Sequence, residues 1–429
     1  MSYLKPSQCD IKKISISNHT KTTVIDKKSS FLEFFHSLDI YENIFNPFIT
    51  ADLVLIDGAS FIERHNITGD EDFEIEFQGY GSEEVLTYKL KVAELVYNVP
   101  APNLRSKNVS LRLTSNEFLI DSSIAISKSY KASTKDIITD IVKKYLGSNK
   151  NIFTEGTKDL PCTLIPFLTP FQSIDFVRQR LVSQKYKSST FLFFETSEGY
   201  FLTTVEGLYE RDKSKAQKFF QREATTENIK GNSPSITDFD SFRLFSNYTV
   251  KSSFNLNHSL KNGGLKSIIS QYDFTTKKFE TRFFQNNPLN SIFIDSTNGK
   301  NPLITSTIYS KFSQNNNKPY FLPFSKYKDT NNNTTNFLFD TLAERLCFSN
   351  LFTMEKTYID IPGNTRISAG SIILLEVPRY DAKESKEFNN QMSTGYYMVT
   401  ACKHSITSAD TAKYDTHLEL MRFGRGVLE

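Results

Sequence analysis

The chain has 429 residues, of which 38% are hydrophobic and 23% charged, and this length allows two to four domains with cores of their own. Its 51 Lys and Arg nearly balance its 48 Asp and Glu, and a net charge of +3 is too small to predict attraction to nucleic acids or membranes. The 37 Phe and 20 Tyr, with no Trp, favour strands, so the composition leans toward β structure.

The four cysteines lie far apart, and no two have the close spacing typical of a zinc site: Cys9, Cys162, Cys347 and Cys402. They favour free thiols in a reducing compartment. The N-terminus has no apolar core of signal-peptide length, and no stretch approaches the roughly 20 apolar residues that span a bilayer. We therefore expect a soluble protein, made in a cytoplasm, with no direct membrane span.

Short alternating segments fill the first part of the chain. Ala51–Ile56 is predicted as a strand, and Phe73–Phe77 alternates apolar and acidic residues as a strand with one buried face must. The same period recurs in Tyr88–Val92 and Val109–Leu113. Several short strands at such close spacing predict a small antiparallel β-barrel over residues 1–125.

Helix signals enter over residues 126–239, which we predict to be an α+β connector domain. Ser133 is a capping residue, and apolar residues then recur at helical spacing as far as Gly147. A second helix is predicted for Phe171–Ser183, and a β-hairpin for Phe191–Leu202.

The rest of the chain returns to β patterns after a polar stretch with a helix signal around Lys213–Gln221. Strands are predicted over residues 240–285 and 345–429, which together would form a second β-barrel. Asn-rich tracts mark residues 286–344 as an inserted, loop-rich segment, because such tracts cannot bury enough apolar surface for a core. The fold class is therefore mainly β with α+β parts.

The chain also resembles itself. Tyr88–Tyr97 and Tyr396–Ser405 are both long strands that begin with Tyr and are followed by a polar loop and an alternating strand. Upstream of each lies a strand, a Gly turn, a linking segment, a Gly and a strand: Leu53–Gly58, Gly69 and Phe73–Phe77, then Tyr358–Gly363, Gly370 and Ile372–Val377. The pattern favours two copies of one barrel design, although any two antiparallel β regions share part of it.

Cys402, His404 and His417 form the one cluster that could bind a metal. Cys402 and His404 alternate onto one strand face, and His417 could face them from the paired strand, so three zinc ligands could meet there. No fourth ligand or supporting group is evident, and three side chains of one hairpin face are the simpler interpretation. We predict no metal site.

Carboxylates and basic residues give no catalytic or nucleic-acid signal. Glu195, Glu198 and Glu206 lie around the predicted hairpin, but nothing fixes two of them across a sugar as a glycosidase requires. No nucleophile elbow, phosphate-binding loop or dinucleotide fingerprint occurs, so we predict no enzyme and no cofactor. Four basic residues favour a solvated face over nucleic-acid binding: Arg105, Lys107, Lys128 and Lys131.

Segments spread over most of the chain carry a family resemblance: Tyr41–Leu53, Gly69–Phe77, Phe171–Phe176 with Phe193–Tyr200, Asn262–Leu265 with Gln271–Thr275, and Ile359–Asn364 with Gly395–Val399 and Leu418–Arg422. They resemble the baseplate hub family of contractile-tailed bacteriophages, and the hub-like N-terminal half of type VI secretion spike proteins. The residues concerned are fold-determining and not catalytic. Residues 286–344 match nothing in that family.

The resemblance implies a viral structural protein of the virion, a homotrimeric tail hub that acts as a symmetry adaptor. Its two barrel domains per subunit would form a ring with pseudo-six-fold symmetry. The implied partners are a trimeric central spike protein, tail tube or tube-initiator proteins, and baseplate wedge and tape-measure proteins, and DNA would pass through the channel without specific binding. The alternatives are a tail-associated peptidoglycan hydrolase, or a hub or spike component of a type VI or extracellular contractile injection system.

Overall fold

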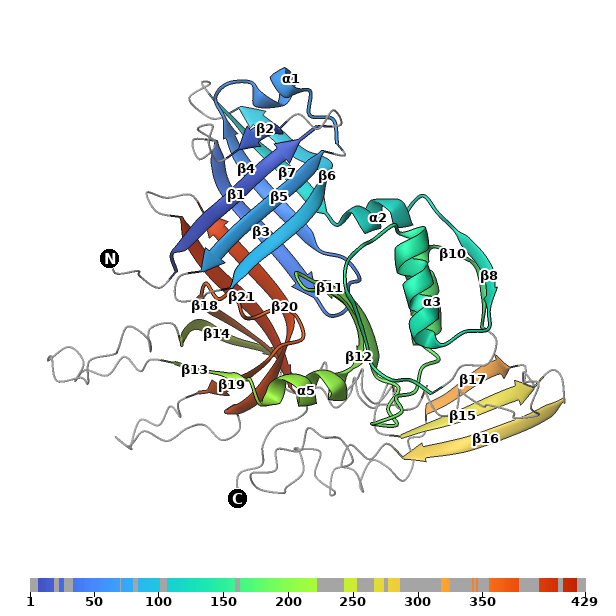
Figure 1. Ribbon diagram of the computed structural model, residues 1–429. Helices are drawn as coiled ribbons and strands as arrows, with labels where there is room; N and C mark the ends of the chain where they lie inside the picture. The colour runs from blue at the N-terminus through green and yellow to red at the C-terminus, as the bar shows by residue number, and fades with distance from the viewer. Residues whose placement is uncertain are drawn as a thin grey trace, which may run out of the picture.

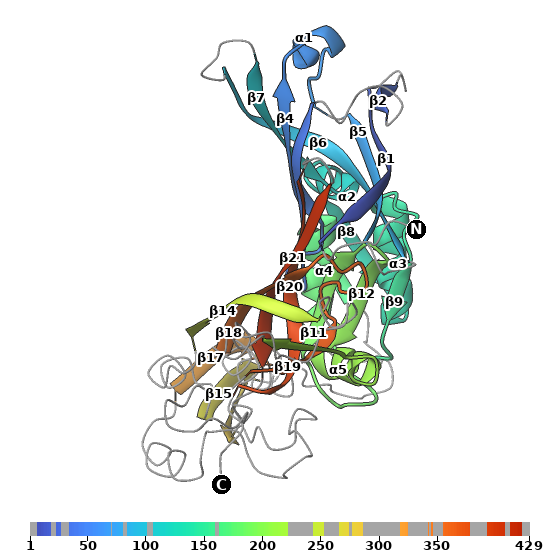
Figure 2. The ribbon, with the colours of Figure 1, turned by 90° about the vertical axis from the view of Figure 1, so that its left-hand side faces the viewer.

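The computed structural model describes most of the chain: residues 7–18, 23–26, 34–69, 71–79, 84–100, 106–158, 163–221, 243–252, 266–273, 277–285, 318–324, 342, 345, 355–377, 393–407 and 412–422. Thirteen of the described strands form one continuous sheet that curls into two barrels, one above the other (Figures 1 and 2). The prediction of a mainly β fold with α+β parts and β-barrels is confirmed.

The first barrel is built from six strands in the order β3-β4-β7-β6-β5-β1. The bounds are β1 Cys9–Ser17, β3 Phe35–Asn43, β4 Thr50–Asp57, β5 Asp72–Gly79, β6 Val85–Pro100 and β7 Lys107–Thr114, with β2 Thr23–Asp26 beside β1 and α1 Phe61–His65 after β4. In β5 the apolar residues are buried and the acids between them are not, as the alternation predicts. The core also takes Ile406 and Tyr414 from near the end of the chain.

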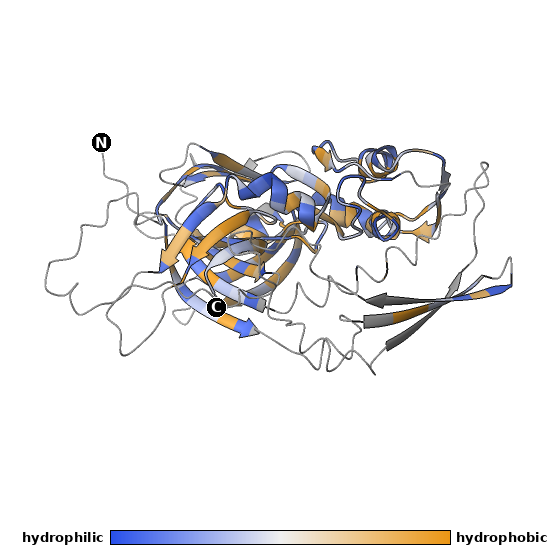
Figure 3. Cartoon of the chain, turned by 90° about the horizontal axis from the view of Figure 1, so that it is seen from below, coloured by the Kyte–Doolittle hydropathy of each residue, from blue (hydrophilic) through white to orange (hydrophobic). Residues whose placement is uncertain are grey.

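The second barrel is closed, because β13 pairs with both β19 and β14. Its strand order is β14-β18-β21-β20-β19-β13, and Figure 3 shows it nearly end-on. The bounds are β13 Gln217–Gln221, β14 Leu244–Ser252, β18 Glu355–Pro362, β19 Ile372–Glu376, β20 Gly395–Thr407 and β21 Lys413–Arg422. The long strands β20 and β21 continue upward into the first barrel, which joins the two barrels in one sheet (Figure 1).

The two barrels are copies in topology. Replacing β3, β4, β7, β6, β5 and β1 by β14, β18, β21, β20, β19 and β13 turns one strand order into the other. The glycines that the sequence comparison paired, Gly69 and Gly370, both have a positive φ, of 106° and 90°, and each precedes the equivalent strand. The first strand of each barrel differs in direction between the two copies: β1 is antiparallel to β5, whereas β13 is parallel to β19.

The middle domain lies beside the barrels (Figure 1). Its elements are α2 Asn116–Asp121, β8 Ile126–Tyr130, α3 Thr134–Asp140 with the π-helical turn Ile141–Tyr145, β9 Ile152–Thr154, β10 Thr163–Leu168, α4 Pro170–Arg178, β11 Phe191–Thr196, β12 Gly199–Thr204 and α5 Val205–Lys213. Ser133 caps α3 as expected, since its hydroxyl accepts a bond from the Asp136 N–H. The second helix ends at Arg178, five residues before the predicted Ser183.

Two predictions for the later part of the chain were wrong in detail. The helix signal around Lys213–Gln221 gives way to strand β13, because Phe219 fills the core of the second barrel and tertiary packing overrides local propensity. Among the described residues of 240–285, only β14 pairs in that barrel. Strands β15 Lys266–Asp273 and β16 Lys278–Gln285 form a separate sheet with β17 Lys318–Phe324, which lies inside the segment expected to be loop-rich.

Candidate functional site

The two barrels meet along β20 and β3. Residues Gly395–Met398 of β20 pair with β19 in the second barrel, and residues Ala401–Thr407 pair with β3 of the first barrel. A β-bulge at Thr400 separates the two halves, since β20 shifts register against β21 there. One edge of one strand therefore serves both barrels.

This junction has a polar outer face and a buried inner face. On the outer face the Lys403 ammonium lies 2.9 Å from an oxygen of Asp39, and the Ser405 hydroxyl donates to the other oxygen at 2.6 Å. On the inner face Cys402, His404 and Ile406 are buried. The His404 Nδ1 and the Tyr414 hydroxyl are 2.8 Å apart, and burial lowers the pKa of His404 to about 4, so this imidazole is neutral at neutral pH.

Glu42, on the inner face of β3, connects all three domains. Its carboxylate accepts a bond from the Tyr88 hydroxyl of the first barrel at 3.0 Å, from the Ser197 N–H of the middle domain at 3.0 Å, and from the Ala369 N–H of the second barrel at 3.1 Å. The side chain is fully buried, and this burial raises the pKa of Glu42 to about 7 although the three donors act in the opposite direction.

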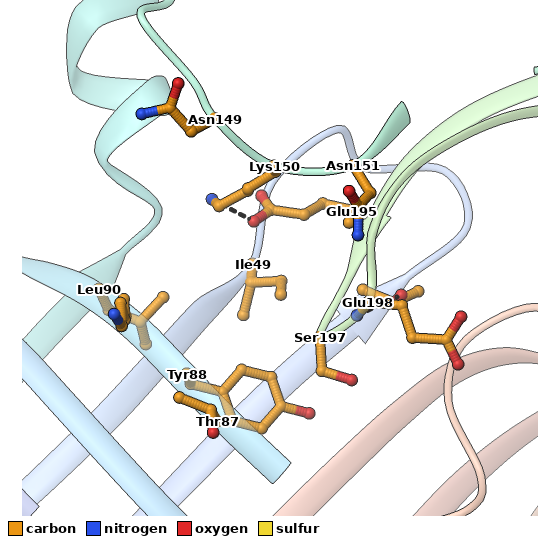
Figure 4. Close-up of a pocket in the computed structure, with 13 residues that line it drawn as sticks. Ile49, Thr87, Tyr88, Leu90, Asn149, Lys150, Asn151, Glu195, Ser197 and Glu198 are labelled. Atoms are coloured by element: carbon orange, nitrogen blue, oxygen red, sulfur yellow. Dashed lines mark hydrogen bonds and ion pairs between the residues drawn. The ribbon is translucent and has the colours of Figure 1, made fainter. Parts of the chain in front are cut away.

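A second buried polar cluster joins the first barrel to the middle domain. The Lys150 ammonium lies 2.7 Å from Glu117 and 2.5 Å from Glu195, and Ser115, directly after β7, donates to Glu195 at 2.7 Å. Burial alone would lower the pKa of Lys150, but the two carboxylates outweigh it and raise that pKa. A cavity of about 250 Å³ borders the cluster and is lined also by Tyr88 (Figure 4).

The three residues of the metal candidate do not come together. The sulfur of Cys402 lies 3.5 Å from the Nε2 of His404 on the inner face, as the alternation predicted. His417 pairs with Lys403 across the hairpin, and its Nδ1 lies 2.5 Å from Asp360. Neighbouring strand positions point to opposite faces, which separates His417 from the other two. Among the described residues, no group of three or more His, Cys, Asp or Glu side chains is arranged to hold a metal.

The three carboxylates weighed as a glycosidase pair, Glu195, Glu198 and Glu206, also lie in separate environments. Glu195 is bound in the Lys150 cluster, and Glu198 points away from it (Figure 4). Glu206 is bonded by Ser188 at 3.1 Å and Thr190 at 2.5 Å. Two of the basic residues have partners, Lys107 with Glu63 and Lys128 with Asp140, and Lys131 is exposed, while Arg105 lies outside the described residues.

Sequence reasoning missed Glu42 and Lys150. A signal for Glu42 was present, because Leu38, Ile40 and Glu42 share one strand face and the first two are apolar, so the carboxylate continues a buried stripe. Lys150 lies in a connecting segment between Tyr145 and β9, where no periodicity marks burial.

Comparison with known proteins shows one relative in sequence and several in fold. No protein-family profile matches the chain. The chain is 20% identical over 390 residues to a probable baseplate hub protein, gp334, of Vibrio phage KVP40. The aligned region covers 89% of this chain and 88% of that protein. The resemblance to baseplate hub proteins is confirmed.

Solved structures show the same fold at lower identity. A tail protein from Neisseria meningitidis MC58 matches with a TM-score of 0.55 and 9% identity over 96% of both chains. The 43 kDa tail protein of prophage MuSo2 from Shewanella oneidensis matches with a TM-score of 0.52 and 9% identity, over 96% of this chain and 98% of that one. In the described residues, no helix is long and apolar enough to cross a membrane.

Proposed function

We propose that this chain is a structural subunit of a phage-tail baseplate hub. The observation that carries the proposal is the hub-like fold, built from two barrels of one strand order in a single continuous sheet. Sequence similarity to a probable baseplate hub protein along nearly the whole chain, and the shared fold of two phage-type tail proteins, support it. The proposed location of the protein is the tail of the virion.

Three copies would form the hub. A subunit that carries two like barrels gives a ring of six like barrels from only three chains, and such a ring can join a three-fold structure to a six-fold one. The three-fold partner would be a central spike, and the six-fold partner would be the tail tube or its initiator. Wedge and tape-measure proteins are further candidate neighbours.

The proposed role is mechanical and not catalytic. The buried carboxylates that sequence analysis weighed are engaged in holding segments together: Glu195 with Lys150 and Ser115, and Glu206 with Ser188 and Thr190. Zymography on peptidoglycan tests this assignment. We expect no clearing, and clearing that disappears in a Glu195→Gln variant would replace the structural role with a hydrolase.

The ring is tested by the mass of the purified chain in solution. Light scattering or mass photometry should give about three times the 49.2 kDa of one chain. A mass of one chain at micromolar concentration, with the spike protein present, would contradict the trimer. Purified virions examined by mass spectrometry should contain the protein in the tail fraction.

A further inference from the structure

The second half of β6 has an open edge that its counterpart β20 does not have. Strand β5 pairs with β6 only as far as Lys91, and the Val92 N–H bonds the carbonyl of Glu71 at 2.9 Å. Beyond this point, from Glu94 to Pro100, β6 pairs with β7 on one side, and within the described part of the chain no strand pairs with the other side.

The two strands have an equivalent register shift at this point. In β6 the register against β7 shifts between Val92 and Glu94, and in β20 the register against β21 shifts between Val399 and Ala401. The Val399 N–H bonds the carbonyl of Ser371 at 2.9 Å, as Val92 bonds that of Glu71. Val92 therefore corresponds to Val399, and Glu94–Leu95 corresponds to Ala401–Cys402. A second register shift, between Leu95 and Tyr97, adds one residue to β6, so Tyr97–Pro100 corresponds to Lys403–Ile406, within the half of β20 that β3 covers.

The exposure of the side chains on this half of β6 also indicates that a pairing strand is missing. Leu95 stands where β20 has Cys402, and Cys402 is 1% exposed whereas Leu95 is 45% exposed. Three more apolar residues of this half of β6 are exposed: Val96 at 41%, Tyr97 at 40% and Val99 at 54%. A group of large apolar side chains beside an open strand edge is a site where another strand adds, because backbone groups and apolar surface are covered together.

The duplication also identifies the covering strand. β3 covers β20, and the copy of β3 in the second barrel is β14. β14 pairs with β18 on one side, as β3 pairs with β4, and its contact with β13 ends at Phe245. From Ser246 to Ser252, no strand in the described residues pairs with the other side of β14.

We propose that Glu94–Pro100 of one copy pairs antiparallel with Ser246–Ser252 of β14 in the next copy. The contact repeats between subunits the β20–β3 junction that exists within each subunit. Each barrel then offers one protruding strand half and one receiving strand, so the contacts run head to tail and close into a ring. The inference rests on the proposed ring of three copies and assigns its interface.

The register predicts which residues meet. His404 pairs with Ile40, and Asn98 corresponds to His404 because Asn98 pairs with Val109 as His404 pairs with Thr416. In the first barrel, Ile40 pairs with Ala51 of β4, and Ala51 pairs with Leu113. In the second barrel, Val250 pairs with Thr357 of β18, and Thr357 pairs with Leu420. Leu113 and Leu420 are equivalent, so Ile40 and Val250 occupy equivalent positions. Asn98 of one copy should therefore lie opposite Val250 of its neighbour.

A cysteine pair tests this register. The double variant Asn98→Cys, Val250→Cys should give covalent dimers and closed trimers on oxidation, seen by non-reducing electrophoresis and reversed by a thiol. Each single variant controls for the chain's own cysteines, and Asn98→Cys with Thr281→Cys, at an exposed position, controls for random collision. A native trimer without this cross-link overturns the assigned interface and leaves the ring standing, whereas a wild-type monomer overturns both.

A charge substitution tests the same edge without relying on a disulfide. Leu95→Asp with Val99→Asp should reduce the mass in solution from three chains to one, and should leave the thermal unfolding of the monomer nearly unchanged because both side chains are half-exposed within the chain. Val85→Asp is the matched control, since Val85 lies on the same strand, is 47% exposed and faces the part that β5 already covers. Trimers that persist in the double variant contradict the proposal.

Discussion

Two buried carboxylate sites hold the domains of this chain together by different means. Between the first barrel and the middle domain, Glu117 and Glu195 share the ammonium of Lys150. At the three-domain junction, Glu42 receives only neutral donors, the Tyr88 hydroxyl and two backbone N–H groups, among the contacts that the structure describes. The carboxylates of both sites are buried, but only the first site contains a cation, Lys150, whose side chain is 29% exposed.

The difference shows in how each site accommodates a charge. Removing a carboxylate from water costs several kcal/mol, and a cation in contact offsets much of that cost. Around Glu42 the cost is offset only in part, so burial raises its pKa to about 7, close to neutral pH. The Lys150 site should therefore be sensitive to loss of its partner, and the Glu42 site to pH.

Removal of Lys150 should have the largest effect. Lys150→Ala leaves two carboxylates that are 6% and 3% exposed without a cation, and breaking such a pair costs about 3–5 kcal/mol. Denaturant unfolding at pH 7.5 measures the loss. Lys143→Ala is the control, because Lys143 is an exposed lysine of the same domain and its removal should change stability by less than about 0.5 kcal/mol.

The charge explanation can be separated from lost packing by a second substitution. Adding Glu117→Gln to Lys150→Ala removes one of the two stranded charges while it keeps the acceptor for the Ser148 hydroxyl, which lies 2.6 Å away. The double variant should recover part of the lost stability. If it is no more stable than Lys150→Ala, the lysine acts through its methylene packing and not through its charge.

The Glu42 site should give an intermediate, pH-dependent effect. The carboxyl keeps its proton to about pH 7 in the folded chain but only to its ordinary pKa of 4.5 when unfolded. Unfolding then releases a proton between these values, so the stability is fully present below pH 4.5 and decreases as pH rises toward 7. The decrease is on the order of 3 kcal/mol and stops above the folded pKa.

Glu42→Gln isolates this contribution, because glutamine has nearly the same shape and does not titrate. The difference in unfolding free energy between the wild type and Glu42→Gln should change between pH 5 and pH 8, and contributions of other groups largely cancel in that difference. A difference that stays constant over this range would show that Glu42 keeps one protonation state throughout.

The sequence predicted those parts of the fold in which apolar and polar residues alternate along a strand. Hairpins such as Phe191–Leu202, and the duplication itself, could be found because strand faces alternate and turns carry glycine. The separate sheet could not, because β15 pairs in parallel with β17 across more than 40 intervening residues, and no local pattern encodes such a pairing. Phe219 shows the same limit, since its strand is decided by the barrel that it completes.

The site was less predictable than the fold, for an electrostatic reason. Sequence patterns treat a charged residue as solvent-facing, yet Glu42 and Glu195 are buried because partners distant in sequence satisfy them. The three candidate metal ligands are separated by a register difference of one residue. Cys402 and His404 share one face of β20, whereas His417 pairs with Lys403, whose side chain points to the opposite face. A register of this kind depends on the loop between the strands, which composition does not fix.

The smallest effect is expected at the outer face of the inter-barrel junction. Lys403 and Asp39 are 31% and 25% exposed, so water screens their ion pair, and Lys403→Ala should cost less than about 1 kcal/mol. A double-mutant cycle with Asp39→Ala measures the coupling directly, and it should be far smaller than the coupling between Lys150 and Glu117. If the two couplings are equal, then exposure does not decide the strength of these contacts. The backbone pairing of β20 with β3, and not the ion pair above it, should hold the barrels together, because seven consecutive residue pairs of that ladder remain in the variant.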